Sequence, residues 1–428
     1  MNSILNPFID ELHYYNTTLE FMTSIEEYID ADTMKMLLYS ERIITFRVPW
    51  LQDNGKLEVN YGYRVQHSSA LGPYKGGIRF HPSVNLDILK FLAFEQTMKN
   101  ALTGLPLGGA KGGADFDPHG KSDHEIMRFC QSYMNELYKY IGATTDIPAG
   151  DIGVGNREIG YMFGQYKKLM NVFEGVFTGK ELHLAGLDGR MQATGFGLIY
   201  ITERLLNTYD DTIQNKRVIV SGSGKVGLYA ALKAQQMGAI IVAMNDSSGT
   251  IVDENGIDVD RLIQYKMIEG KSIRDYCLAS TQILGNVKDI WNIPCDIALP
   301  CATQNELDEN DLEKLTKNGC KVIAEGANKP LTQDAVKAVL ETDILYLPGK
   351  AANAGGVLTS GIEMMQNAQM DVFNFEYVDK RLKEMMEDLF DAIQTKAIEI
   401  NDSKNYLKAS NLLAYEKLSK AIKSQGII

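Results

Sequence analysis

Three lysines in the first third of the chain lie in sequence contexts that are unusual for surface lysines. Lys75 and Lys111 lie within the glycine clusters Gly72–Gly77 and Leu107–Gly113, and Lys99 lies near the end of an apolar segment. Because glycine lets the backbone adopt positive φ and approach a ligand closely, we expect loop geometry to hold the first two lysines in place. Three converging ammonium groups favour an anionic ligand with more than one carboxylate, and one amine is suited to catalysis if its pKa is lowered.

The bulk composition is that of a globular protein with more than one domain. A length of 428 residues exceeds one compact core, which predicts two domains, and 45% hydrophobic and 23% charged residues are ordinary for a soluble protein. The net charge of −12 disfavours nucleic acid and anionic membranes as partners. No apolar run reaches about 18 residues, so no transmembrane helix is expected, and residues 1–10 lack a signal-peptide pattern.

The cysteines and histidines show no pattern of a disulfide framework or a metal site. The five cysteines have no CxxC spacing, which favours reduced thiols and a cytoplasmic location. The six histidines form no HExxH motif and no cluster with cysteine, so we expect no dedicated metal site.

The elements that must position the lysines follow from the apolar spacing. Residues 1–40 have helix-like spacing, and two strands, Arg42–Val48 and Lys56–Val65, are predicted around the hairpin turn Asp53–Gly55.

Two further helices and a loop are predicted before residue 141. The helix Asn85–Leu102 places Gln96 and Lys99 on one face, from which both can reach one ligand. Residues 104–113 are expected to form a glycine-rich loop. A capping box predicts the start of the second helix, Ser122–Tyr140.

Near residue 185 the pattern changes to strands that alternate with helices. This alternation predicts a mostly parallel, doubly wound sheet, and the segment from Val378 to Ile428 is expected to be mainly helical. The predicted strands are Val218–Ser221, Ile240–Met244, Cys295–Pro300, Lys321–Ala324 and Ile344–Leu347.

The segment Arg217–Gly227 carries the spacing GxGxxG, with glycines at 222, 224 and 227. A strand precedes it, a helix follows it, and Asp246 comes about 20 residues later, as in a dinucleotide-binding βαβ unit. The helix N-terminus attracts pyrophosphate. The alternatives are a structural glycine turn and a P-loop, but Val226 stands where a P-loop needs serine or threonine.

Five longer motifs, taken in order, resemble glutamate dehydrogenase of the small hexameric type, within the Glu/Leu/Phe/Val dehydrogenase family. The resemblance extends from about Arg42 to the end of the chain. The motifs are Gly72–Ser83, Phe94–Asn100, Gly108–Gly113, Ile147–Gly155 and Asn353–Met364.

The resemblance implies an α/β fold with two domains and a catalytic cleft between them. Residues 1–185 would bind substrate and mediate assembly, and a C-terminal helix, 405–428, would pack back on them. Residues 186–404 would form a doubly wound, Rossmann-like dinucleotide-binding domain. Closure of the cleft would exclude water before hydride transfer, and the assembly would be a homohexamer.

The resemblance also implies the reaction, which is the reversible conversion of L-glutamate to 2-oxoglutarate and ammonium. Lys75 and Ser360 would bind the distal carboxylate, where relatives acting on leucine or phenylalanine are expected to have apolar groups. Lys111, with its pKa lowered, would activate a water, and Asp151 would transfer protons. The other substrate contacts would be Gln96, Lys99, Gly150 and Arg190.

Each assigned residue has a structural alternative. Lys75 could be a solvated turn lysine, Lys99 an exposed helix lysine and Lys111 a loop charge. Asp151 could stabilise an Asx-turn, and Ser360 could cap a helix.

For the cofactor, the resemblance favours NADP over NAD. Ser247 and Lys266 occupy the positions expected to contact the 2′-phosphate, whereas Asp246 could instead accept from the ribose 2′-hydroxyl of NAD. Thr194 and Asn353 could be simple turn residues. The implied cofactor contacts are Thr194, Gly222, Ser223, Gly224, Lys225, Val226, Gly227, Asp246, Ser247, Lys266, Asn328 and Asn353.

The sequence departs from the family pattern at three places, and all three concern the coenzyme. Lys225 replaces an asparagine, Gly189–Gly195 replaces Arg-Pro-Glu-Ala-Thr-Gly, and Glu269 stands where a basic residue could assist a phosphate. Three alternatives therefore stay open: an NAD-preferring glutamate dehydrogenase, a dehydrogenase of another amino acid, and a non-catalytic nucleotide-binding hexameric scaffold.

Overall fold

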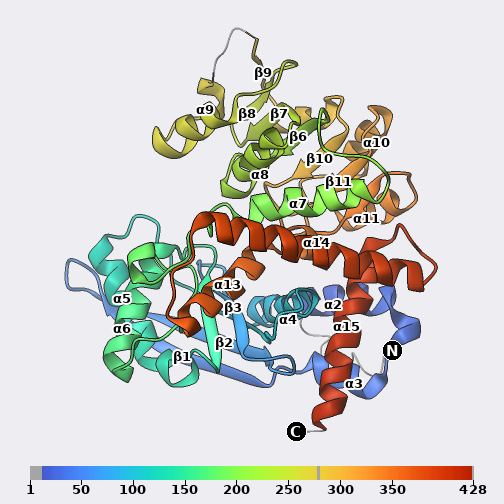
Figure 1. Ribbon diagram of the computed structural model, residues 1–428. Coiled ribbons are helices and arrows are strands. Elements are labelled where there is room, and N and C mark those ends of the chain that lie inside the picture. Colours follow the sequence, from blue (N-terminus) through green and yellow to red (C-terminus); the bar gives the residue numbers. More distant parts are fainter. Residues whose placement is uncertain (1–11, 277–279, 427–428) are drawn as a thin grey trace. The chain divides into compact units, whose positions relative to one another are not determined.

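The computed structural model describes residues 12–276 and 280–426, which divide into two compact units. The first unit contains the described residues up to Asp188, with Ser360–Asn374 and the segment from Asn411 onward (Figure 1). The second contains Gly189–Thr359 and Phe375–Ser410. Cys277 lies outside the described residues. Within these residues, no helix is both long and apolar enough to cross a membrane.

The first unit is built on a five-stranded sheet with the order β1-β2-β4-β3-β5. β1, β2 and β4 are antiparallel neighbours, and β3 runs parallel to both β4 and β5. The strands are β1 (Arg42–Leu51), β2 (Leu57–Ser68), β3 (Tyr74–Phe80), β4 (Gly109–Ala114) and β5 (Asp146–Gly150).

The prediction that loops hold Lys75 and Lys111 is wrong, because both lysines lie in buried strands, β3 and β4. The glycines around them serve close packing. A Cβ on Gly109 would lie 1.9 Å from Thr97 Oγ1, and one on Gly76 would lie 1.6 Å from the Ala110 carbonyl oxygen. Only glycine fits at position 109, where α4 approaches β4, and at position 76, where β4 approaches β3.

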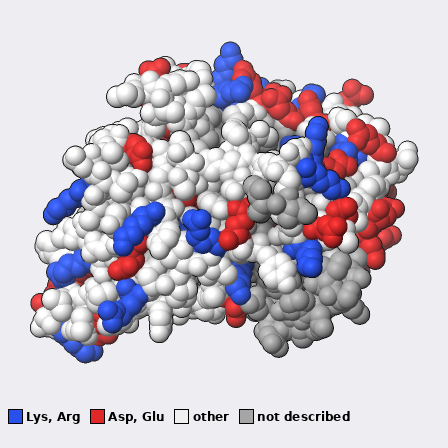
Figure 2. Space-filling view, turned by 90° about the horizontal axis from the view of Figure 1, so that it is seen from below, with Lys and Arg blue, Asp and Glu red and all other residues white. Residues whose placement is uncertain are grey.

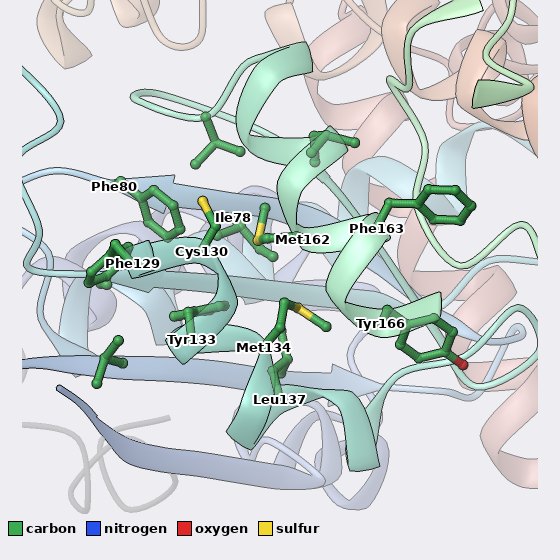
Figure 3. Close-up of a cluster of buried hydrophobic side chains, with 14 of the residues drawn as sticks. Ile78, Phe80, Phe129, Cys130, Tyr133, Met134, Leu137, Met162, Phe163 and Tyr166 are labelled. Carbon is green, nitrogen blue, oxygen red and sulfur yellow. The ribbon is translucent and has the colours of Figure 1, made fainter. Parts of the chain in front are cut away.

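Helices cover this sheet, and the aromatic core lies under two of them. α4 packs against β2 and β4, whereas α5 packs against β1 and α6. Figure 3 shows α5 and α6 contributing side chains to a cluster that also contains Ile78 and Phe80 of β3. In this core the rings of Phe116 and Phe129 stack with centroids 3.8 Å apart. The helices are α2 (Leu12–Ser24), α3 (Ala31–Leu38), α4 (Leu86–Leu102), α5 (Asp123–Leu137), α6 (Asn156–Met170), α13 (Gly355–Gln369) and α15 (Tyr406–Gln425).

Several local predictions are confirmed in this unit. Asn85 caps α4, which has the predicted C-terminal residue, and the predicted capping box of Ser122 with Glu125 begins α5. The boundary between the units lies within α13 and α15, so Ser360 belongs to the first unit. A buried ion pair between Lys180 and Glu363, 2.7 Å long, ties α13 to the loop after α6.

The second unit is built on a seven-stranded sheet with the order β12-β11-β10-β6-β7-β8-β9. Five strands from β12 to β7 are parallel, and β8 and β9 extend the sheet in antiparallel fashion. The predicted doubly wound α/β fold class is confirmed, although β8 and β9 were not predicted. The strands are β6 (Arg217–Ser221), β7 (Ile240–Asp246), β8 (Gly249–Val252), β9 (Gln282–Leu284), β10 (Ile297–Pro300), β11 (Val322–Ala324) and β12 (Leu345–Leu347).

The helices of the second unit alternate with these strands. Figure 1 labels α7, α8, α10 and α11 around the sheet. Their bounds, with those of the remaining helices, are α7 (Ala193–Asn207), α8 (Lys225–Gln236), α9 (Val259–Ile263), α10 (Glu309–Lys317), α11 (Gln333–Leu340), α12 (Gly349–Ala352) and α14 (Phe375–Glu399). Lys266 lies in a short π-helical turn, Gln264–Ile268.

Charge on the surface is mixed in sign. Figure 2 shows lysine and arginine side chains interspersed with aspartate and glutamate on one face, with uncharged areas between them.

Candidate functional site

Strand register brings Lys111 and Asp151 together across β3. Ile78 of β3 pairs with Gly112 of β4 on one side and with Gly150 of β5 on the other. Lys111 precedes the first of these partners and Asp151 follows the second, so the two side chains approach each other diagonally. Lys111 Nζ lies 2.9 Å from Asp151 Oδ2.

Gly77 makes this approach possible. A Cβ at this position would lie 2.9 Å from Asp151 Cβ and from the Gly150 carbonyl oxygen, and 3.4 Å from Lys111 Nζ. Its lack of a side chain therefore leaves the space in which the ammonium and carboxylate meet.

Arg79 is the second cation bound to Asp151, and its position in the sequence did not indicate a role for it. Its Nε donates to Asp151 Oδ2 at 2.8 Å. Burial raises the pKa of Asp151, but the charges and hydrogen bonds of Lys111 and Arg79 outweigh burial and leave that pKa below its usual value. The turn that follows is closed by the backbone bond from Val154 N to Asp151 O, so the aspartate side chain is not the closing group of an Asx-turn.

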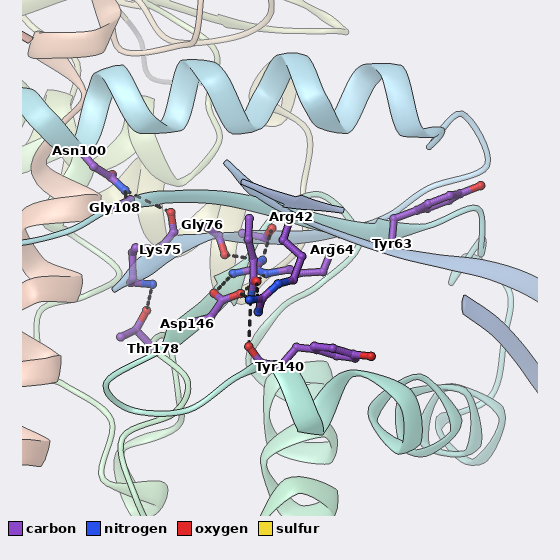
Figure 4. A network of polar contacts seen from close by, with 12 residues as sticks. Arg42, Tyr63, Arg64, Lys75, Gly76, Asn100, Gly108, Tyr140, Asp146 and Thr178 are labelled. Atoms are coloured by element: carbon purple, nitrogen blue, oxygen red, sulfur yellow. Dashed lines mark hydrogen bonds and ion pairs between the residues drawn. The ribbon is translucent and has the colours of Figure 1, made fainter. Parts of the chain in front are cut away.

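Lys75 is buried, with 3% of its surface exposed, so it is not a solvated turn lysine. Its ammonium donates to Thr178 Oγ1 at 2.7 Å (Figure 4). Asn100 of α4 fixes the local backbone by donating to the carbonyl oxygens of Lys75 and Gly108. Thr178 is far from β3 in sequence, and no local pattern could have indicated this contact.

Of the two α4 residues, Gln96 lies close to β3. Gln96 Nε2 donates to Asn100 Oδ1 at 2.7 Å, and Gln96 Cγ lies 3.4 Å from where a Cβ on Gly76 would be. Lys99, one helical turn on, is half-buried rather than fully exposed. Gln96 and Asn100 of α4 therefore lie next to β3.

Ser360 does not cap a helix, because it lies inside α13 and is buried. The next residue, Gly361, would place a Cβ 2.5 Å from Leu105 Cδ1, so this turn of α13 packs against the loop that links α4 to β4. Gly150 ends β5 and is exposed.

In the second unit, the glycine motif forms a tight turn between β6 and α8. Gly222 has φ of 77°, and a Cβ on Gly227 would lie 1.9 Å from the Gly222 carbonyl oxygen. Gly224 is the N-cap of α8, with no side-chain cap and open space where a Cβ would be. The first amides of α8 are thus left without a side-chain acceptor, which fits a dinucleotide pyrophosphate. Ser223 is buried in the turn, whereas Lys225 is exposed.

Asp246 and Lys266 form an ion pair at the end of β7. Lys266 Nζ lies 2.5 Å from Asp246 Oδ2, and Ser248 Oγ and N both donate to Asp246 Oδ1. Burial raises the pKa of Asp246, but these partners lower it to about 2, so it stays ionised. Ser247 is exposed, and Glu269 pairs with Lys271.

The remaining predicted residues of this unit fall into two groups. Asn353, the C-cap of α12, donates to the Ala327 carbonyl oxygen and to Asn328 Oδ1. Thr194 lies in the first turn of α7, and a Cβ on Gly356 would lie 2.9 Å from its hydroxyl oxygen and 3.4 Å from Arg190 Nη2.

Glu325 is a buried residue that sequence reasoning missed. Its carboxylate accepts from Gly349 N at 2.6 Å and from Tyr346 Oη at 2.8 Å, and burial raises its pKa to about 7. It holds the start of α12, the helix that ends at Asn353.

The first unit thus presents the buried Lys111 beside an ionised aspartate, with the buried Lys75 on the same sheet, and the second presents the turn of a dinucleotide-binding βαβ unit. These features are typical of α/β dehydrogenases that use a nicotinamide dinucleotide.

Comparisons with known proteins agree and specify the family. The model of the Glutamate/Leucine/Phenylalanine/Valine dehydrogenase family matches residues 185–426, and that of its dimerisation domain matches residues 40–168. The chain belongs to this family.

Similar proteins are found in bacteria and in a protozoan. The chain is 46% identical to NADP-specific glutamate dehydrogenase of Helicobacter pylori, covering 100% of this chain and 99% of that protein. It is 49% identical to NADP-specific glutamate dehydrogenase of Escherichia coli, covering 96% and 93%. The crystal structure of Plasmodium falciparum glutamate dehydrogenase superposes with a TM-score of 0.97 at 42% identity, covering 100% and 94%.

Proposed function

We propose that the protein is an NADP-dependent glutamate dehydrogenase, which interconverts L-glutamate with 2-oxoglutarate and ammonium. The observation that carries this proposal is the Lys111–Asp151 pair, 2.9 Å apart, on the same sheet as the buried Lys75. The relatives with NADP-specific glutamate dehydrogenase activity match nearly the whole chain, which supports the same reaction here.

The buried lysine provides the basis for substrate choice. Lys75, with Ser360 and Thr178, is assigned to the distal carboxylate of glutamate, because a buried ammonium beside hydroxyl groups suits charge-assisted hydrogen bonds to a carboxylate. Gln96, Lys99, the Gly150 backbone and Arg190 are assigned to the α-carboxylate side.

Lys111 and Asp151 are assigned to the proton transfers. Lys111 activates the water that adds to the α-imine of the oxidised substrate, and the ionised Asp151 takes and returns protons as ammonia leaves. Lys111 and Asp151 are in direct contact, so no water is needed between the ammonium and the carboxylate. In the reverse direction the same groups serve ammonia assimilation.

The dinucleotide is assigned to the second unit, where the uncapped start of α8 suits its pyrophosphate. NADP supplies the hydride acceptor and NADPH the donor. Ser247 and Lys266 are assigned to the 2′-phosphate. Because Lys266 neutralises Asp246, the carboxylate that would repel a phosphate is offset by a cation 2.5 Å away. The Thr194 hydroxyl and the paired Asn328 and Asn353 complete the assigned contacts.

The functional assembly is proposed to be a homohexamer in the cytoplasm. The match to a dimerisation domain over residues 40–168 supports self-association, and cysteines without CxxC spacing suit a reducing compartment.

Initial rates with 2-oxoglutarate and ammonium, measured with NADPH and with NADH, test the proposal. We expect a strong NADPH preference, and Lys266→Ala should raise KM for NADPH far more than KM for NADH. An NADH preference in the wild type would instead assign Asp246 to the ribose hydroxyls of NAD. Faster deamination of leucine or phenylalanine than of glutamate would contradict the substrate assignment. A folded protein that binds dinucleotide but shows no turnover would favour the alternative of a non-catalytic nucleotide-binding scaffold.

A further inference from the structure

The two cations that bind Asp151 both bind the same oxygen. Arg79 Nε lies 2.8 Å and Lys111 Nζ 2.9 Å from Oδ2. Among the described residues, no hydrogen bond reaches Oδ1. The side chains of Arg79 and Asp151 are 21% and 22% exposed, so this cluster is partly open to solvent.

A structural arginine–aspartate pair in the same unit behaves differently. Arg64 binds both oxygens of Asp146, with Nε at 2.9 Å from Oδ2 and Nη2 against Oδ1, and Gln66 adds a third donor (Figure 4). Both side chains of that pair are fully buried. Both oxygens of the Asp146 carboxylate thus have donors, whereas one oxygen of Asp151 has none within the described part of the chain.

The two cations on Oδ2 also differ in chemistry. A guanidinium does not lose its proton in proteins, whereas the ammonium of a lysine can. The charged groups that contact Asp151 are Arg79 from β3 and Lys111 from β4. If Lys111 changes its charge or turns toward a reacting water, only Arg79 keeps the carboxylate ionised and oriented.

We infer that Arg79 is a positioning residue for proton transfer. It holds Asp151 by Oδ2 throughout turnover and leaves Oδ1 as the atom that takes and returns protons. This inference rests on the proposed function, in which Asp151 is the proton-transfer group. In this role Arg79 acts through Asp151.

The test is the pH dependence of glutamate oxidation with NADP in Arg79→Gln and Arg79→Lys. Loss of a hydrogen bond from a charged donor predicts a fall in kcat of about 10- to 100-fold in Arg79→Gln, with little change in KM for glutamate. Because a cation is removed from beside the carboxylate, the pKa on the acid side of the profile should move to higher pH. Arg79→Lys keeps a cation and should restore part of kcat and most of the acid limb.

Arg128→Gln is the matched control, because Arg128 also binds an aspartate, Asp53, at 2.7 Å, away from the site. It should leave kcat and the profile unchanged. A wild-type kcat and acid limb in Arg79→Gln would overturn the inference, as would equal losses in both Arg79 variants with no shift of the acid limb. If Arg79→Gln does not fold, the Arg79→Lys profile decides alone.

Asp151→Asn separates this inference from the proposed function. Full turnover in Asp151→Asn would refute the proton-transfer assignment itself. An inactive Asp151→Asn beside an unaffected Arg79→Gln would refute only the role of Arg79.

Discussion

At the scale of single residues, Lys111 is the group on which turnover should depend most. Lys111→Ala removes the amine that activates water and leaves the dinucleotide turn untouched, so kcat should fall by about 10²- to 10⁴-fold. Dinucleotide binding, followed by fluorescence titration with NADPH, should stay at the wild-type level. Lys121→Ala, in the loop before α5, is the control and should keep full activity. Normal turnover in Lys111→Ala would remove Lys111 from the mechanism.

The sequence was sufficient to find the charged groups of this site but not the polar partners that orient them. Lys75, Lys111 and Asp151 stand in distinctive glycine-rich motifs. Thr178 lies outside those motifs, and Arg79 lies within Gly72–Ser83 without a sign of its role, because their contacts come from a loop about 100 residues from Lys75 along the chain and from strand register. Only the folded sheet shows that these side chains meet.

At the scale of elements, the glycine at position 77 of β3 determines whether two neighbouring strands can bring an acid and an amine together. In Gly77→Ala the new methyl group would lie 2.9 Å from Asp151 Cβ and from the Gly150 carbonyl oxygen, so Asp151 must move. A displacement of about 1 Å predicts a loss of about 100-fold in kcat. Steady-state rates and the melting temperature together check this result.

The control for Gly77→Ala is Gly164→Ala in α6. A Cβ at Gly164 has no atom within 4 Å, and alanine favours a helix by up to about 1 kcal/mol over glycine. This variant should keep kcat and melt at the same or a higher temperature. Equal activity in both glycine variants would show that β3 tolerates a side chain at position 77.

The contact between β2 and α4 contains a buried histidine that should make stability depend on pH. His67 Nδ1 lies 2.8 Å from Thr97 Oγ1, and burial lowers the pKa of His67 to about 4. The folded state keeps this imidazole neutral, while the unfolded chain takes up a proton near pH 6.5. Its contribution to stability is therefore present above about pH 6.5 and is lost as the pH falls toward 4.

Relative to His67→Gln, the wild type should lose about 2 kcal/mol of unfolding free energy between about pH 7.5 and pH 5. Urea unfolding of both proteins at the two pH values measures this difference, because other titrating groups cancel between them. A gap that stays constant between the two pH values would contradict the assignment of a neutral, buried His67.

Element prediction succeeded where the apolar period was regular. The βαβ alternation and the α4 helix followed from spacing, and the start of α5 followed from its capping box. It failed for β3 and β4, because their glycines are typical of loops unless a packed helix such as α4 requires them. It also missed β8 and β9, which are short and add to the edge of a sheet.

At the scale of the whole molecule, the two units are not continuous in sequence. Ser360–Asn374 and the segment from Asn411 belong with the N-terminal part of the chain. Local patterns predict the helix α15, but they predict neither α13 nor the residue at which each of these helices passes from one unit to the other. That assignment depends on long-range packing, such as the Lys180–Glu363 pair.

The β1–β2 hairpin carries an exposed apolar face that suits self-association. Register pairs Leu51 with Leu57 and Pro49 with Val59, and Leu57, Val59 and Tyr61 are 60%, 52% and 58% exposed. The inward residues of β1 pack against α5, so only the outward face is open. β1 is also the edge of its sheet, and an edge strand of 10 residues offers unpaired backbone groups to a second copy.

A charge on this face should therefore reduce the assembly without unfolding the subunit. Val59→Asp places a carboxylate where an interface would exclude water, at a cost of several kcal/mol for each buried copy, whereas in the free subunit it stays solvated. Light scattering after size exclusion should show a hexamer for the wild type and smaller species for Val59→Asp, with unchanged circular dichroism. Lys56→Ala, on the same hairpin but at a solvated ion pair with Glu58, should remain hexameric. A hexameric Val59→Asp would mean that the subunits associate through another surface, and the exposed hairpin face would then need a different partner.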